Sequence, residues 1–410
     1  MSKKLVIIGG GFGGLAAAKA LKKEDVSITL IDKTNHHLFL PLLYQVATAM
    51  LAPAQVAAPI REIFRKQKNA LVIMGTVEKI DLKTKQIHAD NRQYNYDYLI
   101  ISGGLANSYF AKDAWEEFAP SLKTLGDAIK IREKILLSLE KAESECSDDE
   151  RKKHLTFVIV GGGPTGVEVA GAIAELTKSM LKDFKRVKPK STRIILLEVL
   201  DHILCGFSSS LSAKGKKALE DLGVEVRLNV RITDINSNGI RIDDGFIETE
   251  NVIWAAGARA QVFMQSISTE TDKAGRIMVN DYCSVKGHPE VFVIGDAAIF
   301  MNSGNVLPAT APVAIQQGKY VSRLIIGELC GKPRKPFNYK DKGSMAIIGT
   351  HKAVLQSGKL EISGYLAWLF WMVLHICVIA EFRNRHMVLV QWLWYYTTRH
   401  PGVRLITGRK

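Results

Sequence analysis

A glycine-rich loop near the start of the chain constrains the fold more than any other feature of the sequence. Residues 5–8 form an apolar run. Gly9, Gly11 and Gly14 follow it on the G-x-G-x-x-G spacing, and a helical pattern opens at Leu15. In such a turn the first glycine permits the sharp bend, the second lets a pyrophosphate approach the backbone, and the third lets helix and strand pack closely. The loop therefore predicts a dinucleotide-binding βαβ unit.

An acidic residue in the expected place strengthens this prediction. The next apolar stretch, residues 27–31, ends at Asp32, about 20 residues beyond the loop, where the ribose of a dinucleotide needs a hydrogen-bond acceptor. A glycine-rich turn that binds nothing is the alternative. Strand, loop, helix, strand and acid in this order favour the nucleotide site.

The same pattern of strand, glycine loop and helix occurs a second time in the middle of the chain. Residues 156–160 form an apolar strand, and Gly161, Gly163 and Gly166 repeat the glycine spacing. The strand after the next helical pattern ends at Glu198. Such an internal repeat predicts two dinucleotide-binding units in one chain, and therefore two bound dinucleotides.

These repeats predict an α/β protein with two Rossmann-like domains and a C-terminal helical segment that associates with membranes. The predicted boundaries are residues 1–112 with 262–335 for the first nucleotide domain, 113–261 for the second, and 336–410 for the C-terminal region. Residues 126–153 predict one charged amphipathic helix. With 410 residues, of which 47% are hydrophobic, the chain can fill cores of this size.

The charge, the cysteines and the histidines limit the partners and the compartment. A net charge of +14 suits nucleic acid or an anionic membrane. The sequence has no zinc-finger spacing or arginine-rich arm, so we do not expect nucleic acid.

Five scattered cysteines without a C-x-x-C pair predict no disulfide framework and a reducing compartment. The N-terminal apolar run belongs to the glycine-loop strand rather than to a signal peptide. His36 and His37 lack further spaced ligands, and no metal site is expected.

A third acidic residue follows a late apolar strand. Residues 291–294 precede Gly295 and Asp296. A carboxylate at this place can accept a hydrogen bond from a ribityl hydroxyl group of a flavin. An aspartate that caps a helix explains the stretch equally well.

The end of the chain is apolar and aromatic. Residues 365–380 are an unbroken apolar run, shorter than the approximately 20 residues of a membrane span, and residues 387–396 form a second such stretch. Tryptophans beside arginines are typical of helices in a membrane interface. Of three interpretations of these stretches, we favour a helix pair that lies in the membrane interface. A helix of the core or of a dimer contact ranks second, and a membrane span ranks third.

Taken together, these features resemble the type II NADH dehydrogenases, the single-subunit NADH:quinone oxidoreductases of respiratory membranes, and in particular their bacterial branch. The resemblance covers nearly the whole chain. Beyond the glycine loops, the motifs that carry it are residues 39–47, 196–198, 254–259, 294–296, 314–318, 382–385 and 404–407.

The resemblance implies the two-dinucleotide-binding flavoprotein fold, with FAD on the first unit and NADH on the second. It implies FAD contacts at Gly9, Gly11, Gly14, Asp32, Lys33, Val77, Asp296 and Ala311. The further expected cofactor-binding residues are Gly13, Pro41, Gly161, Gly163, Gly166, Glu198, Gly257 and Gly295. Glu168 matches the family's glutamate at the nicotinamide–flavin stack, and Gln316 matches its quinone-site glutamine, so these two are the expected catalytic residues. A first-turn glutamate that only complements the helix dipole is the alternative for Glu168.

The implied reaction passes a hydride from NADH to FAD and then two electrons to a membrane quinone, without proton pumping. The implied partners are the quinone and the lipid surface, at the cytoplasmic face of the inner membrane, and a homodimer is a further option. Where the family often has a second glutamine, this chain has Pro312. Two rivals stay open. A sulfide:quinone oxidoreductase would need a reactive cysteine pair at the flavin, and an NAD(H)-binding redox sensor would not turn NADH over rapidly with a quinone.

Overall fold

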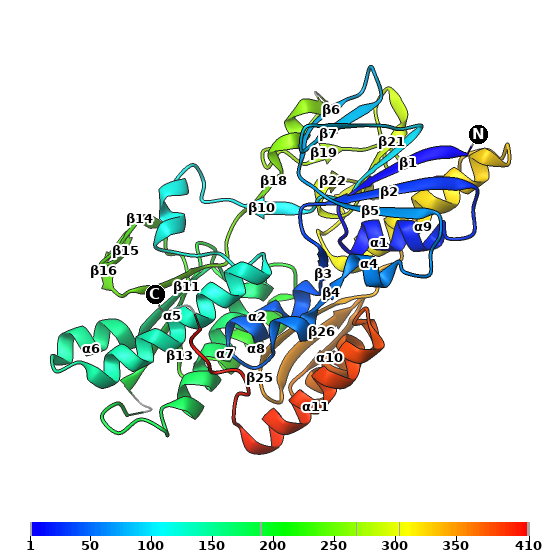
Figure 1. Ribbon diagram of the computed structural model, residues 1–410. Coiled ribbons are helices and arrows are strands. Elements are labelled where there is room, and N and C mark those ends of the chain that lie inside the picture. Colours follow the sequence, from blue (N-terminus) through cyan, green and yellow to red (C-terminus); the bar gives the residue numbers. More distant parts are fainter. Residues whose placement is uncertain (1, 189–190, 268, 303, 408–410) are drawn as a thin grey trace. The chain divides into compact units, whose positions relative to one another are not determined.

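The computed structural model describes residues 2–188, 191–267, 269–302 and 304–407, and its chain divides into two compact units (Figure 1). Unit 1 contains Met1–Leu38, Ala57–Ala106 and Ala258–Lys340. Unit 2 contains Phe39–Val56, Asn107–Gly257 and Asp341–Lys410. Each glycine loop lies in a unit of its own. The predicted α/β fold with two Rossmann-like domains is therefore confirmed.

The sheet of unit 1 is built around the strand that precedes the first glycine loop. β1 (Lys3–Ile8) pairs in parallel with β2 (Val26–Asp32) on one side and with β9 (Tyr98–Ile101) on the other. The strand order is β20-β21-β9-β1-β2-β5, with β5 at Ala70–Met74, β20 at Ser284–Val285 and β21 at His288–Val293. β20 is antiparallel to β21, and the other pairs are parallel. Ligands of such sheets bind at the carboxyl ends of the strands where the order reverses, which here is β1.

Two helices of unit 1 pack closely beside this sheet. α1 (Phe12–Ala20) and α9 (Ala311–Leu329) lie side by side (Figure 1). A Cβ atom at Gly318 would overlap the carbonyl oxygen of Gly13, so the backbones meet directly. α9 therefore fixes the helix that carries the first glycine loop. The smaller elements are β3 (His36–Leu38), β4 (Ala57–Pro59), α4 (Ile60–Ile63), β6 (Val77–Asp81), β7 (Gln86–Ala89), β8 (Arg92–Asn95), β19 (Ile277–Met278), β22 (Ala298–Ile299), β23 (Met301–Asn302) and β24 (Asn305–Val306).

Unit 2 repeats this arrangement with a four-stranded parallel sheet of order β13-β12-β11-β17. Every residue of β11 and of β17 is buried, as expected for parallel strands covered on both faces. The elements are β11 (Thr156–Val160), α7 (Pro164–Met180), β12 (Arg193–Leu197), α8 (Ser209–Glu220), β13 (Val224–Arg227) and β17 (Asn251–Trp254), with an antiparallel sheet of β14 (Ile232–Asn236), β15 (Gly239–Ile242) and β16 (Gly245–Glu248). Strands β10 (Leu105–Asn107) and β18 (Ala258–Ala260) pair where the chain passes between the units.

The single helix predicted over residues 126–153 is wrong. The structure has α5 (Leu125–Ser144) and α6 (Asp148–Leu155). Between them, the side chain of Glu145 accepts hydrogen bonds from the next two backbone N–H groups at 2.8 and 3.0 Å. The side chain of Ser147 then caps α6. These local bonds compete with a continuous helical ladder and end α5.

From Asp341 onward the chain completes unit 2. β25 (Ser344–Gly349), β26 (Lys352–Ser357) and β27 (Leu360–Ser363) form an antiparallel sheet that packs on α7 and α8. α10 (Tyr365–Val378) lies against this sheet beside α11 (Phe382–Thr398), in orange and red in Figure 1. The short helices α2 (Leu43–Ala47) and α3 (Pro53–Val56) contact α7 and α11, respectively.

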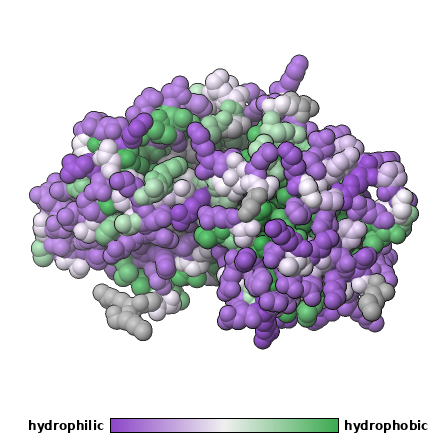
Figure 2. Space-filling view, turned by 90° about the horizontal axis from the view of Figure 1, so that it is seen from above, coloured by the Kyte–Doolittle hydropathy of each residue, from purple (hydrophilic) through white to green (hydrophobic). Residues whose placement is uncertain are grey.

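The two C-terminal helices each have a buried face and an exposed apolar face. Trp368, Trp371 and Trp392 are buried in unit 2. The exposed apolar residues include Leu366, Leu369, Phe370, Val373, Leu374, Leu389, Val390, Leu393 and Trp394. The face of the molecule in Figure 2 is by contrast mainly hydrophilic, with small hydrophobic patches. Among the described residues, none of the helices has the length and hydrophobicity needed to cross a membrane.

Candidate functional site

The two glycine loops have the same local geometry. Gly9 and Gly161 have φ angles of +100° and +106°, which glycine adopts without strain. A Cβ atom at Gly14 would overlap the carbonyl oxygen of Gly9, and one at Gly166 would overlap that of Gly161. Both loops therefore need glycine to bring the start of the helix against the end of the strand.

The middle glycines leave open space. A Cβ atom at Gly11 or Gly163 would meet no other atom within 4 Å. These residues are the N-caps of α1 and α7, and neither has a side-chain cap. Helix starts of this kind suit a phosphate, whose charge the helix dipole also favours.

An acidic side chain reaches each loop from the neighbouring strand. Oδ2 of Asp32 accepts a hydrogen bond of 2.6 Å from the N–H of Gly10, and Oε2 of Glu198 accepts one of 2.5 Å from the N–H of Gly162. The second oxygen of each acid accepts from the backbone N–H two residues further on. Because a carboxylate has about four acceptor positions, each acid keeps capacity for a ribose hydroxyl group.

Two residues without a predicted role support the first loop. His37 is buried, with Nδ1 3.0 Å from the carbonyl oxygen of Gly10, and burial lowers its pKa. Gln317 is fully buried, and its Oε1 accepts a 2.7 Å hydrogen bond from the N–H of Gly295. Its Nε2 has no hydrogen-bond partner among the described residues. An unpaired buried donor is costly, so this nitrogen suits a site where a bound group supplies the acceptor.

The predicted site residues divide between the units. Unit 1 contains Gly9, Gly11, Gly13, Gly14, Asp32, Lys33, Val77, Gly295, Asp296, Ala311 and Gln316. Unit 2 contains Pro41, Gly161, Gly163, Gly166, Glu168, Glu198 and Gly257. Gln316 bonds both backbone groups of Lys340: its Nε2 donates to the carbonyl oxygen at 2.9 Å, and its Oε1 accepts from the N–H at 3.1 Å. The amide of Gln316 therefore ties the segment after α9 to the helix.

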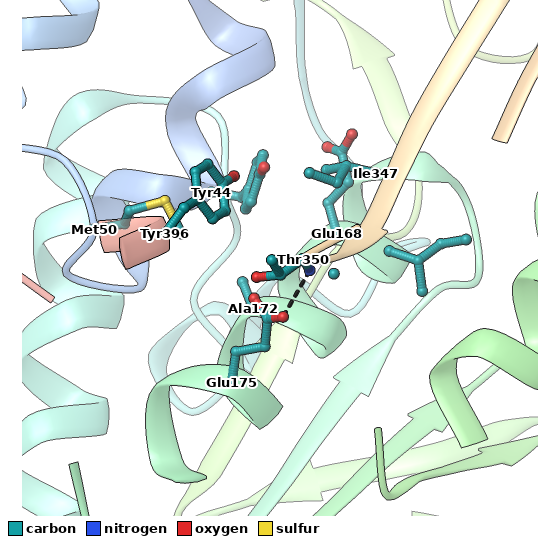
Figure 3. A pocket seen from close by; sticks show the side chains of 10 residues that line it. Tyr44, Met50, Glu168, Ala172, Glu175, Ile347, Thr350 and Tyr396 are labelled. Carbon is teal, nitrogen blue, oxygen red and sulfur yellow. Dashed lines mark hydrogen bonds between the residues drawn. The ribbon is translucent and has the colours of Figure 1, made fainter. Parts of the chain in front are cut away.

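A pocket in unit 2 lies along α7 (Figure 3). Its polar lining residues are Tyr44, Glu168, Glu175, Thr350 and Tyr396, and its apolar ones are Met50, Ala172, Ile347, Ile348 and Gly349. The cavity volume is about 10 Å³, which is about the space of one water molecule. The walls approach closely because β25 lies directly on α7 at Gly171. A Cβ atom at this position would overlap the carbonyl oxygen of Ile348, so only glycine allows this contact.

Glu168 is an acid of this pocket with a raised pKa. Desolvation raises the pKa of its carboxyl group to about 8, although a hydrogen bond from the backbone of Ile347 acts in the opposite direction. At neutral pH the group therefore keeps its proton. A carboxylate that only complemented the helix dipole would have a lowered pKa, so the direction of the shift favours a proton-handling group over that alternative.

Tyr44 is held in the pocket by a chain of buried hydrogen bonds. Its hydroxyl group accepts a hydrogen bond of 2.8 Å from Nε2 of Gln45, whose Oε1 accepts one of 2.7 Å from Nε1 of Trp392. All three side chains are buried. Burial, and next the charge of Glu168, raise the pKa of Tyr44 well above its ordinary value, so the phenol stays neutral.

Comparison with known proteins decides the family. Residues 3–318 match the family described as pyridine nucleotide-disulphide oxidoreductase. The chain is 43% identical to the type II NADH:quinone oxidoreductase NdhA of Mycobacterium tuberculosis, over 99% of this chain and 90% of the relative. The protein belongs to the type II NADH:quinone oxidoreductases. It is also 40% identical to Ndh of the same organism, over 99% of this chain and 91% of that one.

A solved structure shares the fold of this type II NADH:quinone oxidoreductase. The structure of NDH2 from Plasmodium falciparum in complex with NADH matches it with a TM-score of 0.89 at 21% identity, over 99% of this chain and all of that one. At this identity the match shows the fold. It agrees with the doubled nucleotide unit derived above.

The residues of unit 1 fit the FAD expected of a type II NADH:quinone oxidoreductase. The uncapped start of α1 suits a pyrophosphate, and Asp32 retains an acceptor position for a ribose hydroxyl group. The unpaired Nε2 of Gln317, beside Gly295, offers a buried donor. In unit 2 the start of α7 suits the pyrophosphate of NADH, and Glu198 takes the place that Asp32 has in unit 1.

Proposed function

We propose that this chain is an FAD-dependent NADH:quinone oxidoreductase of a respiratory membrane that does not pump protons. When bound, FAD supplies the redox chemistry, by taking a hydride from NADH and passing two electrons to the quinone. One observation carries the proposal. A single chain has two glycine loops of the same geometry, each joined to an acid, so it offers one site to FAD and one to NADH.

Unit 2 selects NADH over NADPH in this proposal. Glu198 can accept a hydrogen bond from the 2′-hydroxyl group of the adenosine ribose, whereas its charge repels a 2′-phosphate. The next residues, Val199, Leu200 and Asp201, supply no cation that would offset this repulsion.

Glu168 handles a proton in the quinone half of the reaction. Reduction of a quinone to a quinol consumes two protons as well as two electrons. Because the Glu168 carboxyl group holds its proton at neutral pH, it can act as a general acid. We place the quinone contact at Gln316, whose amide would exchange one of its bonds to Lys340 for a bond to the quinone.

The C-terminal helices supply the membrane contact in this proposal. Their exposed apolar side chains lie on the outer faces of α10 and α11, and Arg383 is exposed beside them. Apolar side chains would enter the interface and cations would meet anionic headgroups. We infer peripheral binding to the cytoplasmic face of the inner membrane, where the quinone is dissolved. A second copy of the chain, in a homodimer, is the other occupant that would cover this face.

The test is an absorption spectrum of the purified protein. We expect oxidised flavin, complete bleaching when NADH is added anaerobically, and recovery when a quinone analogue follows. Glu168→Gln should leave the bleaching rate unchanged and slow the recovery about 100-fold, the low end of the usual effect of a general acid. Protein that is not yellow would overturn the proposal. Protein that bleaches but recovers only over minutes would also overturn it, and would favour a redox sensor.

The cysteines argue against the sulfide:quinone alternative. Oxidation of sulfide on this fold needs a reactive cysteine pair. All five cysteines are free, and Cys283 is buried in unit 1, where burial raises the pKa of its thiol. The described lining of the Glu168 pocket contains no cysteine.

A further inference from the structure

A second carboxyl group of the Glu168 pocket has no part in the reaction described so far. Glu175 follows Glu168 on α7 by seven residues, or about two helical turns. The two side chains therefore project from the same face of the helix, with about 10 Å of rise between them. This separation is too long for direct proton transfer, so any transfer needs groups in between.

The pocket supplies such groups in the form of two phenols. Tyr44 on α2 and Tyr396 on α11 both line the cavity, in which they appear near Glu168 and Glu175 (Figure 3). The pKa of Tyr44 responds to the charges of Glu168, Tyr396 and Glu175, and that of Tyr396 responds to Glu175. Burial raises both phenol pKa values above the ordinary range. A neutral hydroxyl group can accept a proton on one side while it donates its own on the other.

A water molecule completes this set of groups. Oγ1 of Thr350 is buried and has no hydrogen-bond partner among the described residues, and Thr350 lines the same cavity. Its backbone N–H donates a hydrogen bond of 2.6 Å to Oε1 of Glu175, which places the hydroxyl group near that carboxylate. Because the cavity has room for about one water molecule, a water there would satisfy Oγ1.

Glu175 is only partly buried, so its end of the pocket lies near the surface of unit 2. The charged or titratable groups that face Glu175 are Tyr44, Tyr395, Tyr396 and Arg399: the hydroxyl group of Tyr395 lies 3.5 Å from Oε2, and the charge of Arg399 acts on both α11 tyrosines. Arg399 is exposed. A proton can therefore enter from bulk water at this end and leave at Glu168.

We propose that Glu175 is a relay residue that reloads Glu168 with protons through Tyr396, Tyr44 and a water at Thr350. The inference rests on the proposed role of Glu168. After the O–H bond of Glu168 breaks and its proton forms an O–H bond on the reduced quinone, the Glu175 carboxylate takes a proton from solvent and passes it into the relay. Each hydroxyl group and the water take up one proton and give up one, the last proton forms a new O–H bond on Glu168, and Glu175 is left as a carboxylate again. No electron moves in these steps.

The test compares Glu175→Gln with wild type in separate half-reactions. Glutamine keeps the shape and an acceptor for the Thr350 N–H but carries no transferable proton. We expect flavin reoxidation by the quinone to slow at least about tenfold, with a larger solvent deuterium effect, because a positioned proton transfer contributes roughly 10²–10⁴-fold. Flavin reduction by NADH, and turnover with ferricyanide, which takes no proton, should stay unchanged. Glu150→Gln on exposed α6 is the matched control.

A second measurement does not depend on turnover. The infrared band of the protonated Glu168 carboxyl group, identified by its loss in Glu168→Gln, should exchange hydrogen for deuterium at least about tenfold more slowly in Glu175→Gln. Tyr396→Phe and Thr350→Val should slow it too, and they decide the matter if Glu175→Gln does not fold. Unchanged exchange and reoxidation, with Glu168→Gln still impaired, would overturn the relay alone. Full activity of Glu168→Gln would instead overturn the proposed role of Glu168.

Discussion

The indole Nε1 of Trp392 donates a hydrogen bond of 2.7 Å to Oε1 of Gln45, and both side chains are completely buried. Gln45 in turn donates to the hydroxyl group of Tyr44 at 2.8 Å, and Tyr44 lines the Glu168 pocket. The last helix of the chain is thus joined by two hydrogen bonds to the pocket where we place the proton chemistry. α11 therefore belongs to the core of unit 2 as well as to its exposed apolar face.

Removing the indole N–H alone should measure this connection. Trp392→Phe leaves Oε1 of Gln45 buried without its donor, so we expect the free energy of unfolding to fall by roughly 1–3 kcal/mol, together with some loss of packing. Trp394→Phe, on the exposed face of α11, is the control and should change stability little. Denaturant unfolding of both variants checks this, and equal effects would show that the hydrogen bond has no special weight.

The two open glycines should separate the two nucleotide sites. Valine fits the protein at Gly11 and at Gly163, where φ is −75° and −68° and no atom lies within 4 Å of a new Cβ atom. Gly11→Val should give folded but colourless protein. Gly163→Val should stay yellow but fail to bleach with NADH. A yellow Gly11→Val protein would show that FAD lies elsewhere.

Glu198 should determine the choice of nicotinamide cofactor. Wild type should prefer NADH, and Glu198→Gln should raise kcat/KM for NADPH relative to NADH at least about tenfold, since a charge repulsion of roughly 1.4 kcal/mol is removed. Steady-state kinetics with a soluble acceptor measure this ratio. If wild type used both cofactors equally well, the acid would not be near the ribose.

Glu168 should make stability depend on pH. Its pKa is raised to about 8 from the ordinary 4.5, so the folded state holds this proton more tightly than the unfolded chain does. Its contribution to stability is full below pH 4.5, falls as the pH rises from there to about 8, and is then lost. The stability of Glu168→Gln relative to that of wild type should therefore rise as the pH increases across this window. Parallel Tm curves of the two proteins from pH 5 to 8 would contradict the raised pKa.

Charges on the exposed apolar face should weaken membrane binding. Phe370→Glu and Leu393→Glu change side chains that are 55% and 67% exposed, so both variants should stay folded. We expect several-fold weaker cosedimentation with anionic lipid vesicles, because a carboxylate enters the interface poorly. Val262→Glu, at an exposed position of unit 1, is the control. If both tail variants bound vesicles as well as wild type does, the exposed apolar face would not be the membrane contact, and a dimer contact would be favoured instead.

The nucleotide units could be predicted from the sequence because their requirements are local. The bend at Gly9, the overlap that forbids a side chain at Gly14 and the acid at Asp32 all act within one strand–loop–helix–strand segment. The break between α5 and α6 was missed even though it is local, because side-chain bonds of Glu145 and Ser147 outweigh the helical pattern there. Gln317 was missed because only burial shows that one end of its amide is unpaired.

The sequence by itself thus determined the doubled α/β architecture, the family and the two acids, because glycine spacing and apolar runs fix a backbone path over a few tens of residues. Only the tertiary structure decided how the aromatic tail is used. It buries Trp371 and Trp392 in unit 2, and it brings Tyr396 to the pocket of Glu168 and Glu175. These residues are far apart in the chain. Their meeting depends on backbone contacts such as that of Gly171 with Ile348, and on the burial that raises the pKa of Glu168, which no local pattern of residues specifies.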